Sequence, residues 1–370
     1  MKNSGTHTQY TAVERNNQLV LILNSEIKLP EDAPVRVTSA QLEELDYRKL
    51  YAAYSSRGRK SVTDPRVIFK VMAYGYQCGI FSSQKLEEAC QYRVDFMWLP
   101  ENQKAPDHAT FFRFRTGRCS EAVEDLFIAA NSEYITGIEA FSNRTDVGTF
   151  IPFMRKLELA HQRRYEEVIT DAGYESLDNY LYLEANGQMS FIKPTNYEAQ
   201  KTKKFRDQIG RIENMKYDQD EDCFICAEGR KLHCRKESTL MQDGIPVTRA
   251  WYRCESCENC PQRERCCRKQ DINAPKEVIW KKTFREKREV SLQNITCDRG
   301  IMLRMNRSIL VEGAFGLLKN DFSFRRFMTT GKRNIRIELF FLALGFNLKK
   351  RWMKQQKSRL ETHYSEKKAS

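Results

Sequence analysis

The chain has 370 residues, of which 41% are hydrophobic, and this content is enough for one large core or two moderate ones. A chain that is disordered throughout is therefore excluded. The 62 Lys and Arg residues outnumber the 49 Asp and Glu residues, so the formal net charge of +13 favours binding to polyanions such as nucleic acids.

Membrane-spanning and secreted proteins are disfavoured by the apolar runs of the chain. The longest runs, at 19–23 and 339–346, fall far short of the roughly 20 residues that span a bilayer, and the pattern of a signal peptide is lacking. We therefore expect a cytoplasmic protein with no membrane partner. In that reducing compartment the 12 cysteines are expected to be thiols or metal ligands.

Residues 1–37 form a mixed N-terminal segment, and a compact helical pattern follows at 38–120. Ser39 resembles a helix cap, and Asp64-Pro65 predicts a helix start with proline at the first position. Further helices are predicted from Ser82 and after Asp107.

The last of these helices interleaves aromatic residues with Arg113 and Arg115. Several short helices with basic turns are typical of a helix-turn-helix DNA-binding domain, in which these two arginines are candidate DNA contacts. A purely structural helical domain fits the same pattern.

Beyond residue 120 the pattern changes to alternating strands and helices. Strands are predicted at 134–141, 167–170 and 189–193, and Thr145-Asp146 caps a predicted helix between the first two. Residues 121–197 therefore predict an α/β fold.

Asp171 directly follows the apolar strand at 167–170 and precedes a tight turn and a helix opened by Ser176. In open α/β sheets, ligands and catalytic groups lie at the carboxyl ends of the strands. Asp171 is therefore a candidate catalytic and metal-binding residue.

Residues 198–282 are polar, charged and rich in cysteine, and Trp251 and Tyr252 are expected to give this insertion a small core of its own. The tight cysteine spacing suits a structural four-thiolate Zn²⁺ site, although reduced and unliganded cysteines are the alternative. The spacing leaves open which four residues would bind. The candidates are Cys226, Cys254, Cys257, Cys260 and Cys266.

The segment 307–319 predicts an amphipathic helix. Its apolar stripe has helical spacing, and Glu312 and Lys319 are expected to lie one above the other at the edge of that stripe. A solvated surface helix fits this segment taken alone. The stripe consists of Val311, Ala314, Phe315 and Leu318.

A basic stretch follows, in which Arg325, Arg326, Lys332 and Arg333 are spaced for contacts to DNA phosphates. Residues 351–370 form a charged tail. Acidic groups that converge in so basic a protein are costly unless they hold a divalent cation, and their oxygens favour Mg²⁺ or Mn²⁺.

Together these motifs resemble bacterial insertion-sequence transposases of the DDE type. The turn at 169–174 is similar to the motif of the second catalytic aspartate, and 307–316 with Lys319 and Phe324-Arg325-Arg326 is similar to the motif of the final glutamate. Residues 58–118 resemble the N-terminal domain of the family, and the cysteine-rich stretch resembles an insert that some members carry.

The resemblance implies a mixed α/β fold, in which a helical DNA-binding domain precedes an RNase H-like core made of 121–197 and 283–350. It also implies that Asp171, Glu312 and a further Asp bind Mg²⁺ or Mn²⁺, and that Arg307 and Lys319 hold DNA phosphates. The implied partners are terminal inverted repeats and target DNA, bound by a homodimer at the nucleoid.

The first catalytic aspartate of the family is not found. It ends an early core strand, but residues 121–134 contain no apolar strand followed by Asp. Asp125 precedes an apolar run and Asp146 resembles a helix cap, so neither replaces it.

We therefore expect an internal deletion and a transposase whose Mg²⁺-dependent strand cleavage and transfer are abolished or severely reduced. A catalytically dead DNA-binding remnant is the alternative, and a zinc-stabilised structural protein without a DNA role is the third possibility.

Overall fold

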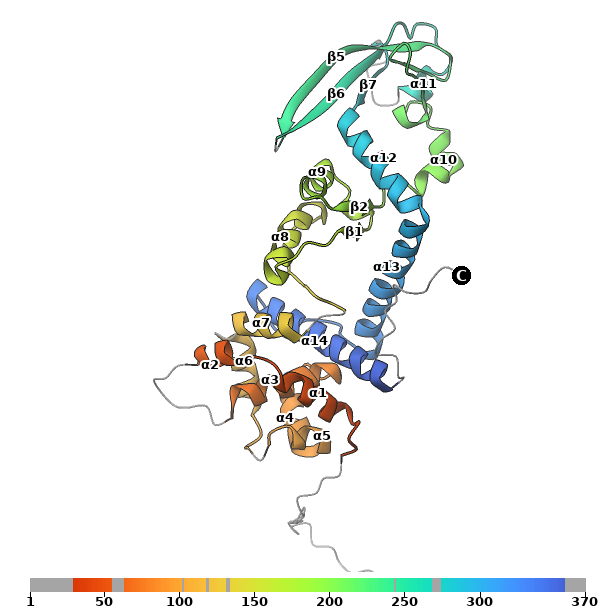
Figure 1. Ribbon diagram of the computed structural model, residues 1–370. Coiled ribbons are helices and arrows are strands. Elements are labelled where there is room, and N and C mark those ends of the chain that lie inside the picture. The colour runs from red at the N-terminus through yellow and green to blue at the C-terminus, as the bar shows by residue number, and fades with distance from the viewer. Residues whose placement is uncertain are drawn as a thin grey trace, which may run out of the picture.

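The computed structural model describes residues 29–54, 63–101, 103–117, 120–130, 134–242, 244–267 and 274–356. Figure 1 shows a helical body at one end, a small α/β layer in the middle and a long β-hairpin at the other end, with α12 (Lys282–Thr296) and α13 (Asp298–Gly316) running along one side. The predicted mixture of helices and sheet is confirmed. No helix of the described residues is long and apolar enough to cross a membrane.

The helical body surrounds α3, which is buried along almost its whole length. The predicted start of this helix is confirmed, since the Asp64 side chain accepts a hydrogen bond of 2.8 Å from the Arg66 N–H. The helices of the body are α1 (Pro34–Glu43), α2 (Arg48–Ala52), α3 (Pro65–Gln77), α4 (Ser83–Tyr92), α5 (Val94–Trp98), α6 (His108–Thr116), α7 (Ser120–Ala130) and α14 (Lys332–Gln356).

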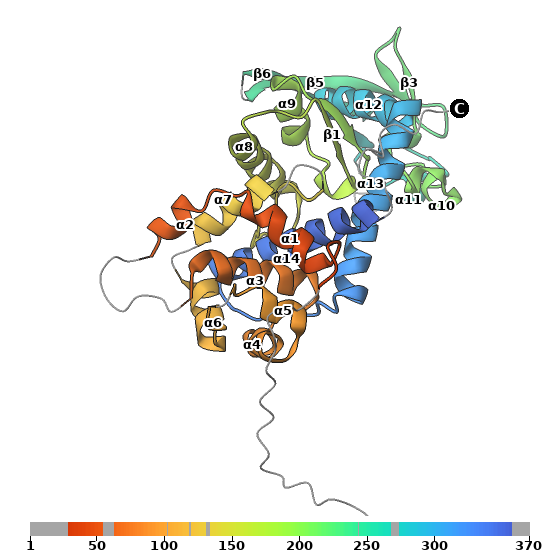
Figure 2. The same cartoon turned by 60° about the horizontal axis from the view of Figure 1, so that its bottom comes forward.

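The C-terminal helix α14 belongs to the core of the helical body, where it packs on α3 and α7 (Figure 2). The Phe341 ring lies 5.5 Å from the Phe69 ring, and Gly345 allows a close crossing, because a Cβ there would lie 2.6 Å from the Gln77 nitrogen. Most of α14 lies within the predicted catalytic core of 283–350, and no sequence signal indicates its packing on α3 and α7.

The first helix also differs from the prediction. It begins at Pro34, whose fixed φ suits the first helical position, so Ser39 lies inside the helix and does not cap it. The predicted starts of α4 and α6 near Ser82 and Asp107 are confirmed.

The middle layer contains β1 (Glu167–Thr170) and β2 (Met189–Ile192), which confirm the strands predicted at 167–170 and 189–193. The two strands pair in parallel. The connecting helix α9 (Leu177–Ala185) starts at the predicted Ser176, whose Oγ accepts from the Asn179 N–H. Helix α8 (Phe150–His161) precedes β1, and α12 covers β2, where Ser291 Oγ accepts from the Ile192 N–H.

The strand predicted at 134–141 is wrong, because these residues form no ladder with a neighbouring strand. Instead, the buried side-chain amide of Asn347 on α14 binds both the N–H and the C=O of Ile135, at 3.1 and 2.9 Å. A side chain from a distant helix thus satisfies the backbone groups that a partner strand would satisfy.

The cysteine-rich insertion is an antiparallel five-stranded sheet in chain order. Its predicted core is confirmed around Tyr252, Phe224 and Leu232, whereas Trp251 is half-buried. The strands are β3 (Lys216–Asp218), β4 (Cys223–Ile225), β5 (Lys231–Gln242), β6 (Ile245–Cys254) and β7 (Glu277–Trp280); short helices are α10 (Lys203–Arg206), α11 (Arg263–Cys266), η1 (Val147–Thr149), η2 (Ala172–Tyr174), η3 (Ala199–Lys201), η4 (Ile212–Asn214) and the π-helical turn η5 (Leu317–Asp321).

Candidate active site and DNA-contacting residues

Asp171 lies at the carboxyl end of β1, as predicted, and its side chain is fixed from two sides. Oδ1 accepts the Gly173 N–H at 3.1 Å, and Oδ2 accepts from an Arg307 guanidinium nitrogen at 3.0 Å. The structure therefore brings two of the predicted site residues together as an ion pair.

Helix α13 runs beside β1 because ion pairs join them at both ends of the strand. Arg299 contacts Glu167 at 2.7 Å, and its hydrogen bonds lower the pKa of that carboxyl. Arg307 contacts Asp171 eight residues later. Eight helical residues rise about 12 Å and four strand residues span about 13 Å, so the two elements match in length.

Asp146 is a second carboxylate at this place, although its position in the sequence predicts a helix cap. Its side chain caps no backbone N–H. A Cβ on Gly173 would lie 3.2 Å from Asp171 Oδ1 and 3.5 Å from Asp146 Oδ2, so both carboxylates border the same glycine. Burial, and then the nearness of both carboxylates, raise the pKa of Tyr174.

Asp146, Asp171, Tyr174 and Arg307 line one cavity of about 520 Å³, together with Glu139. The cavity lies between α8, the end of β1 and the segment that precedes α8. No sequence signal placed Asp146 here, because its approach to Asp171 depends on the packing of α8 against β1 and β2.

Glu312 is on α13, as predicted, but it does not line this cavity among the described residues. It follows Arg307 by five residues, which is about 140° around a helix, so the α13 face that reaches Asp171 is not the face of Glu312. Glu312 is exposed, and its Oε1 accepts from Ser308 Oγ at 2.8 Å.

The continuous helix expected for 307–319 is also corrected. Helix α13 ends at Gly316, and Lys319 lies in the π-helical turn η5, so the two charged residues do not stack at α-helical spacing. Ala314 and Leu318 contact the helical body, whereas Val311 is exposed. The Phe315 side chain is outside the described residues.

Comparisons with known proteins match two separate parts of the chain, one near its N-terminus and one in its C-terminal half. Residues 225–352 match the transposase DDE domain family, and residues 23–117 match the transposase domain family DUF772. The chain belongs to the insertion-sequence DDE transposases. The search of curated proteins gives no match, and the search of solved structures gives none either.

DDE transposases generally use divalent metal ions. The described residues of this transposase contain no group of three or more His, Cys, Asp or Glu side chains placed to hold a metal ion. Asp171 is instead neutralised by Arg307, and Glu312 faces elsewhere. The carboxylates present therefore do not fit the predicted Mg²⁺ or Mn²⁺ centre.

Most of the predicted DNA contacts are accessible. Arg113 on α6 is exposed, and so are Arg325, Arg326, Lys332 and Arg333 before and at the start of α14. Arg115 is a correction, because it is buried in the helical body, where its guanidinium donates to the Phe81 C=O at 2.7 Å. A phosphate could not reach Arg115 without unfolding of that core.

Several predicted cysteine ligands lie close together at one end of the insertion. Burial, followed by the neighbouring thiols of Cys257 and Cys226, raises the pKa of Cys254 to about 12. Burial also raises the pKa of Cys266 to about 11. Cys257 Sγ accepts the Lys276 N–H at 3.3 Å. These thiols, with Cys260, do not form a ready metal site within the part of the chain that the structure describes.

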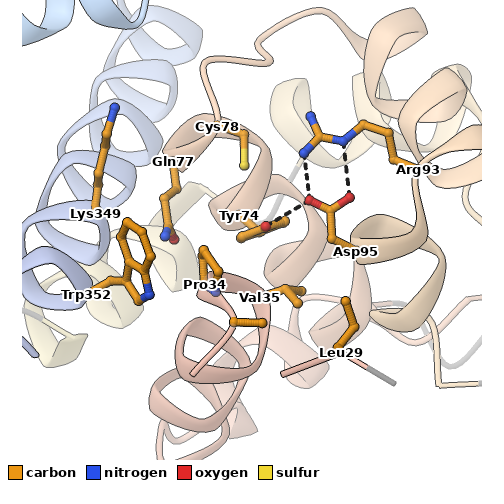
Figure 3. A pocket seen from close by; sticks show the side chains of 11 residues that line it. Leu29, Pro34, Val35, Tyr74, Gln77, Cys78, Arg93, Asp95, Lys349 and Trp352 are labelled. Atoms are coloured by element: carbon orange, nitrogen blue, oxygen red, sulfur yellow. Dashed lines mark hydrogen bonds and ion pairs between the residues drawn. The ribbon is translucent and has the colours of Figure 1, made fainter. Parts of the chain in front are cut away.

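A second cavity, of about 350 Å³, lies in the helical body between α1, α3, α5 and α14 (Figure 3). Asp95 accepts hydrogen bonds from Tyr74 Oη at 2.9 Å and from Arg93 at 2.6 Å, so its charge is neutralised. The arrangement ties α3 to α5 and gives this cavity no reactive carboxylate.

Proposed function

We propose that this transposase binds DNA at the ends of its element and that its strand cleavage is abolished or severely reduced. The observation that carries the proposal is the pairing of Asp171 with Arg307 on a helix face that turns Glu312 away. Two-metal phosphoryl transfer requires carboxylates that converge on the ions. The exposed arginines and lysines support retained binding to DNA phosphates.

We further propose that an internal segment with the first catalytic aspartate is missing between Phe127 and Tyr134. An isolated two-stranded sheet such as β1–β2 is marginal by itself, and larger sheets are the rule. Helix α13 also leaves one apolar face 42 to 60% exposed, which suits a face that further core elements would cover. The residues of this face are Ile301, Met305 and Ile309, which follow one another at intervals of four.

In an RNase H-like core completed by that segment, α13 would turn so that Arg307 leaves Asp171 and Glu312 faces it, and both carboxylates would share the binding of Mg²⁺ or Mn²⁺ with the missing aspartate. Arg307 and Lys319 would then hold DNA phosphates, and the N-terminal helices would recognise terminal repeats as part of a homodimer. The alternative proposal is a DNA-binding remnant without any cleavage, which would compete with intact transposases for the same ends.

Salt-dependent binding tests the DNA-binding part of this proposal. The logarithm of the association constant should fall steeply with the logarithm of salt concentration, and R325A/R326A should make the slope shallower by about 2, because two phosphate contacts are lost. The slope is measured by fluorescence anisotropy on a 40-bp duplex from the end of the element.

The matched control is R235A/R249A, which removes two exposed arginines from β5 and β6 of the insertion. Its slope should equal that of the unmodified chain. An unmodified chain whose binding to DNA does not respond to salt would contradict the proposal.

We also propose that the insertion takes up one structural Zn²⁺ through Cys226, Cys254, Cys257 and either Cys260 or Cys266. The support is the spacing and the nearness of Cys226 and Cys257 to Cys254. Protein purified without chelator should contain about one zinc per chain by mass spectrometry. Cys254→Ser should lose the metal and lower the melting temperature.

Cys297→Ser is the control for this substitution, since Cys297 is exposed, lies outside the insertion and hydrogen-bonds to local backbone, the Gly300 N–H and the Asn294 C=O. It should keep the metal. Zinc-free protein that melts like the zinc-loaded form would refute a structural zinc site.

A further inference from the structure

The loop between η5 and α14 places two exposed apolar side chains among four cations. Phe327 is 38% exposed and Met328 is 45% exposed. Arg325 and Arg326 precede them directly, and Lys332 and Arg333 follow within five residues, all exposed. Phe327 and Met328 therefore lie in the part of the chain where a polyanion is expected to bind.

Contacts to α14 and to the rest of the helical body hold this loop in one conformation. Glu338 on α14 is fully buried, and its Oε2 accepts the Met328 N–H at 2.8 Å while its Oε1 accepts from Thr329 Oγ1. The Phe324 ring packs edge-on against Phe327 at 5.4 Å and against Phe81 of the helical body at 5.1 Å. Gly331, with φ of +85°, turns the chain into α14.

The loop also adjoins the candidate active site. Lys332 Nζ lies 5.8 Å from the Phe141 ring, and Phe141 lines the cavity that contains Asp171. On its other side, Arg333 donates to the Gly117 C=O at the end of α6, which carries the exposed Arg113. A duplex that contacts these cations would therefore lie across Phe327 and Met328.

We propose that Phe327 and Met328 form an apolar wedge that enters double-stranded DNA between two base pairs and unstacks them. Apolar side chains flanked by Arg and Lys do this in proteins that kink DNA from the minor groove, and pyrimidine–purine steps yield most easily. The hydrogen bonds from Met328 and Thr329 to the buried Glu338 suit this role. A flexible loop would change its own conformation before it separated two stacked base pairs. The inference rests on the proposed DNA binding.

The test uses 40-bp duplexes from the end of the element with 2-aminopurine at successive adenines. Binding of the unmodified chain should raise the fluorescence at one step. F327A/M328A should lose this rise but keep the salt slope, because all four cations remain. Phe327→Leu should keep the rise, since leucine also serves as a wedge.

L240A/M241A is the matched control, as it removes an exposed apolar pair from the tip of β5, and it should keep the full rise. An unmodified chain that binds with no rise at any adenine would overturn the wedge, as would an F327A/M328A protein with an unchanged rise. Loss of self-association in F327A/M328A, with the rise unchanged, would show a protein-contact role instead. Absence of salt-dependent binding by the unmodified chain would overturn the proposed function itself.

Discussion

A graft that supplies an apolar strand ending in Asp between Phe127 and Tyr134 should raise Mg²⁺-dependent DNA cleavage at least about 10²-fold over the unmodified chain. The reason is that one lost electrostatic contact to a transition state costs about 2.7–4 kcal/mol, which is about 10²–10³ in rate. The rate is measured as nicking of an end-labelled duplex that carries the end of the element.

The same graft with Asn in place of its final Asp is the control, and it should leave cleavage at the level of the unmodified chain. The two grafts differ by one carboxylate, so a difference in rate reports metal-site chemistry and not the repair of folding. Equal cleavage by both grafts would refute the role given to the missing aspartate.

Glu175→Ala should lower the free energy of unfolding by about 3–5 kcal/mol, because it leaves a largely buried arginine without its counter-charge. The Glu175 side chain is 1% exposed, and Arg288 on α12 binds both of its oxygens at 2.6 Å. Thr195 donates two further hydrogen bonds and Tyr180 one. Glu175 thus joins the turn after Asp171 to the end of β2 and to α12.

Urea denaturation followed by circular dichroism measures this loss, and Glu184→Ala is its control. Glu184 on α9 pairs at 2.6 Å with Lys287 on α12, the neighbour of Arg288, but Glu184 is half exposed. Exposed pairs contribute about 0.2–1 kcal/mol. A loss for Glu175→Ala no larger than that for Glu184→Ala would contradict the structural role of the buried pair.

The same carboxylate gives stability a pH dependence. Burial raises the pKa of Glu175, but the hydrogen bonds from Arg288 and Thr195 outweigh burial, and the net pKa is lowered. The stability it contributes is therefore present above the unfolded value of about 4.3 and is lost as pH falls through the lower folded value. Glu175→Ala should flatten this acid-side decline.

Features that depend on neighbours in sequence were predictable. Asp64-Pro65 starts α3, Ser176 starts α9, and Asp171 ends β1, because caps, proline and strand ends act within a few residues. The family motifs likewise extend over short segments, so the membership could be predicted from the residues alone.

Features that depend on distant packing were not predictable. The Ile135 backbone is satisfied by Asn347, more than 200 residues away, so an extended segment without a strand partner looked like a strand. Arg115 has the pattern of a surface cation, but α3 and the Phe81 carbonyl bury it. Asp146 meets Asp171 only through the packing of α8.

The loss of strand cleavage is tested by incubating an end-labelled 40-bp terminal duplex in Mg²⁺ with the unmodified chain and, in parallel, with Glu312→Gln. The same sample reports binding by anisotropy. We expect salt-dependent binding by both proteins and equal, background-level cleavage. Cleavage by the unmodified chain at least tenfold above Glu312→Gln would contradict this expectation, because Glu312 would then act in a complete active site.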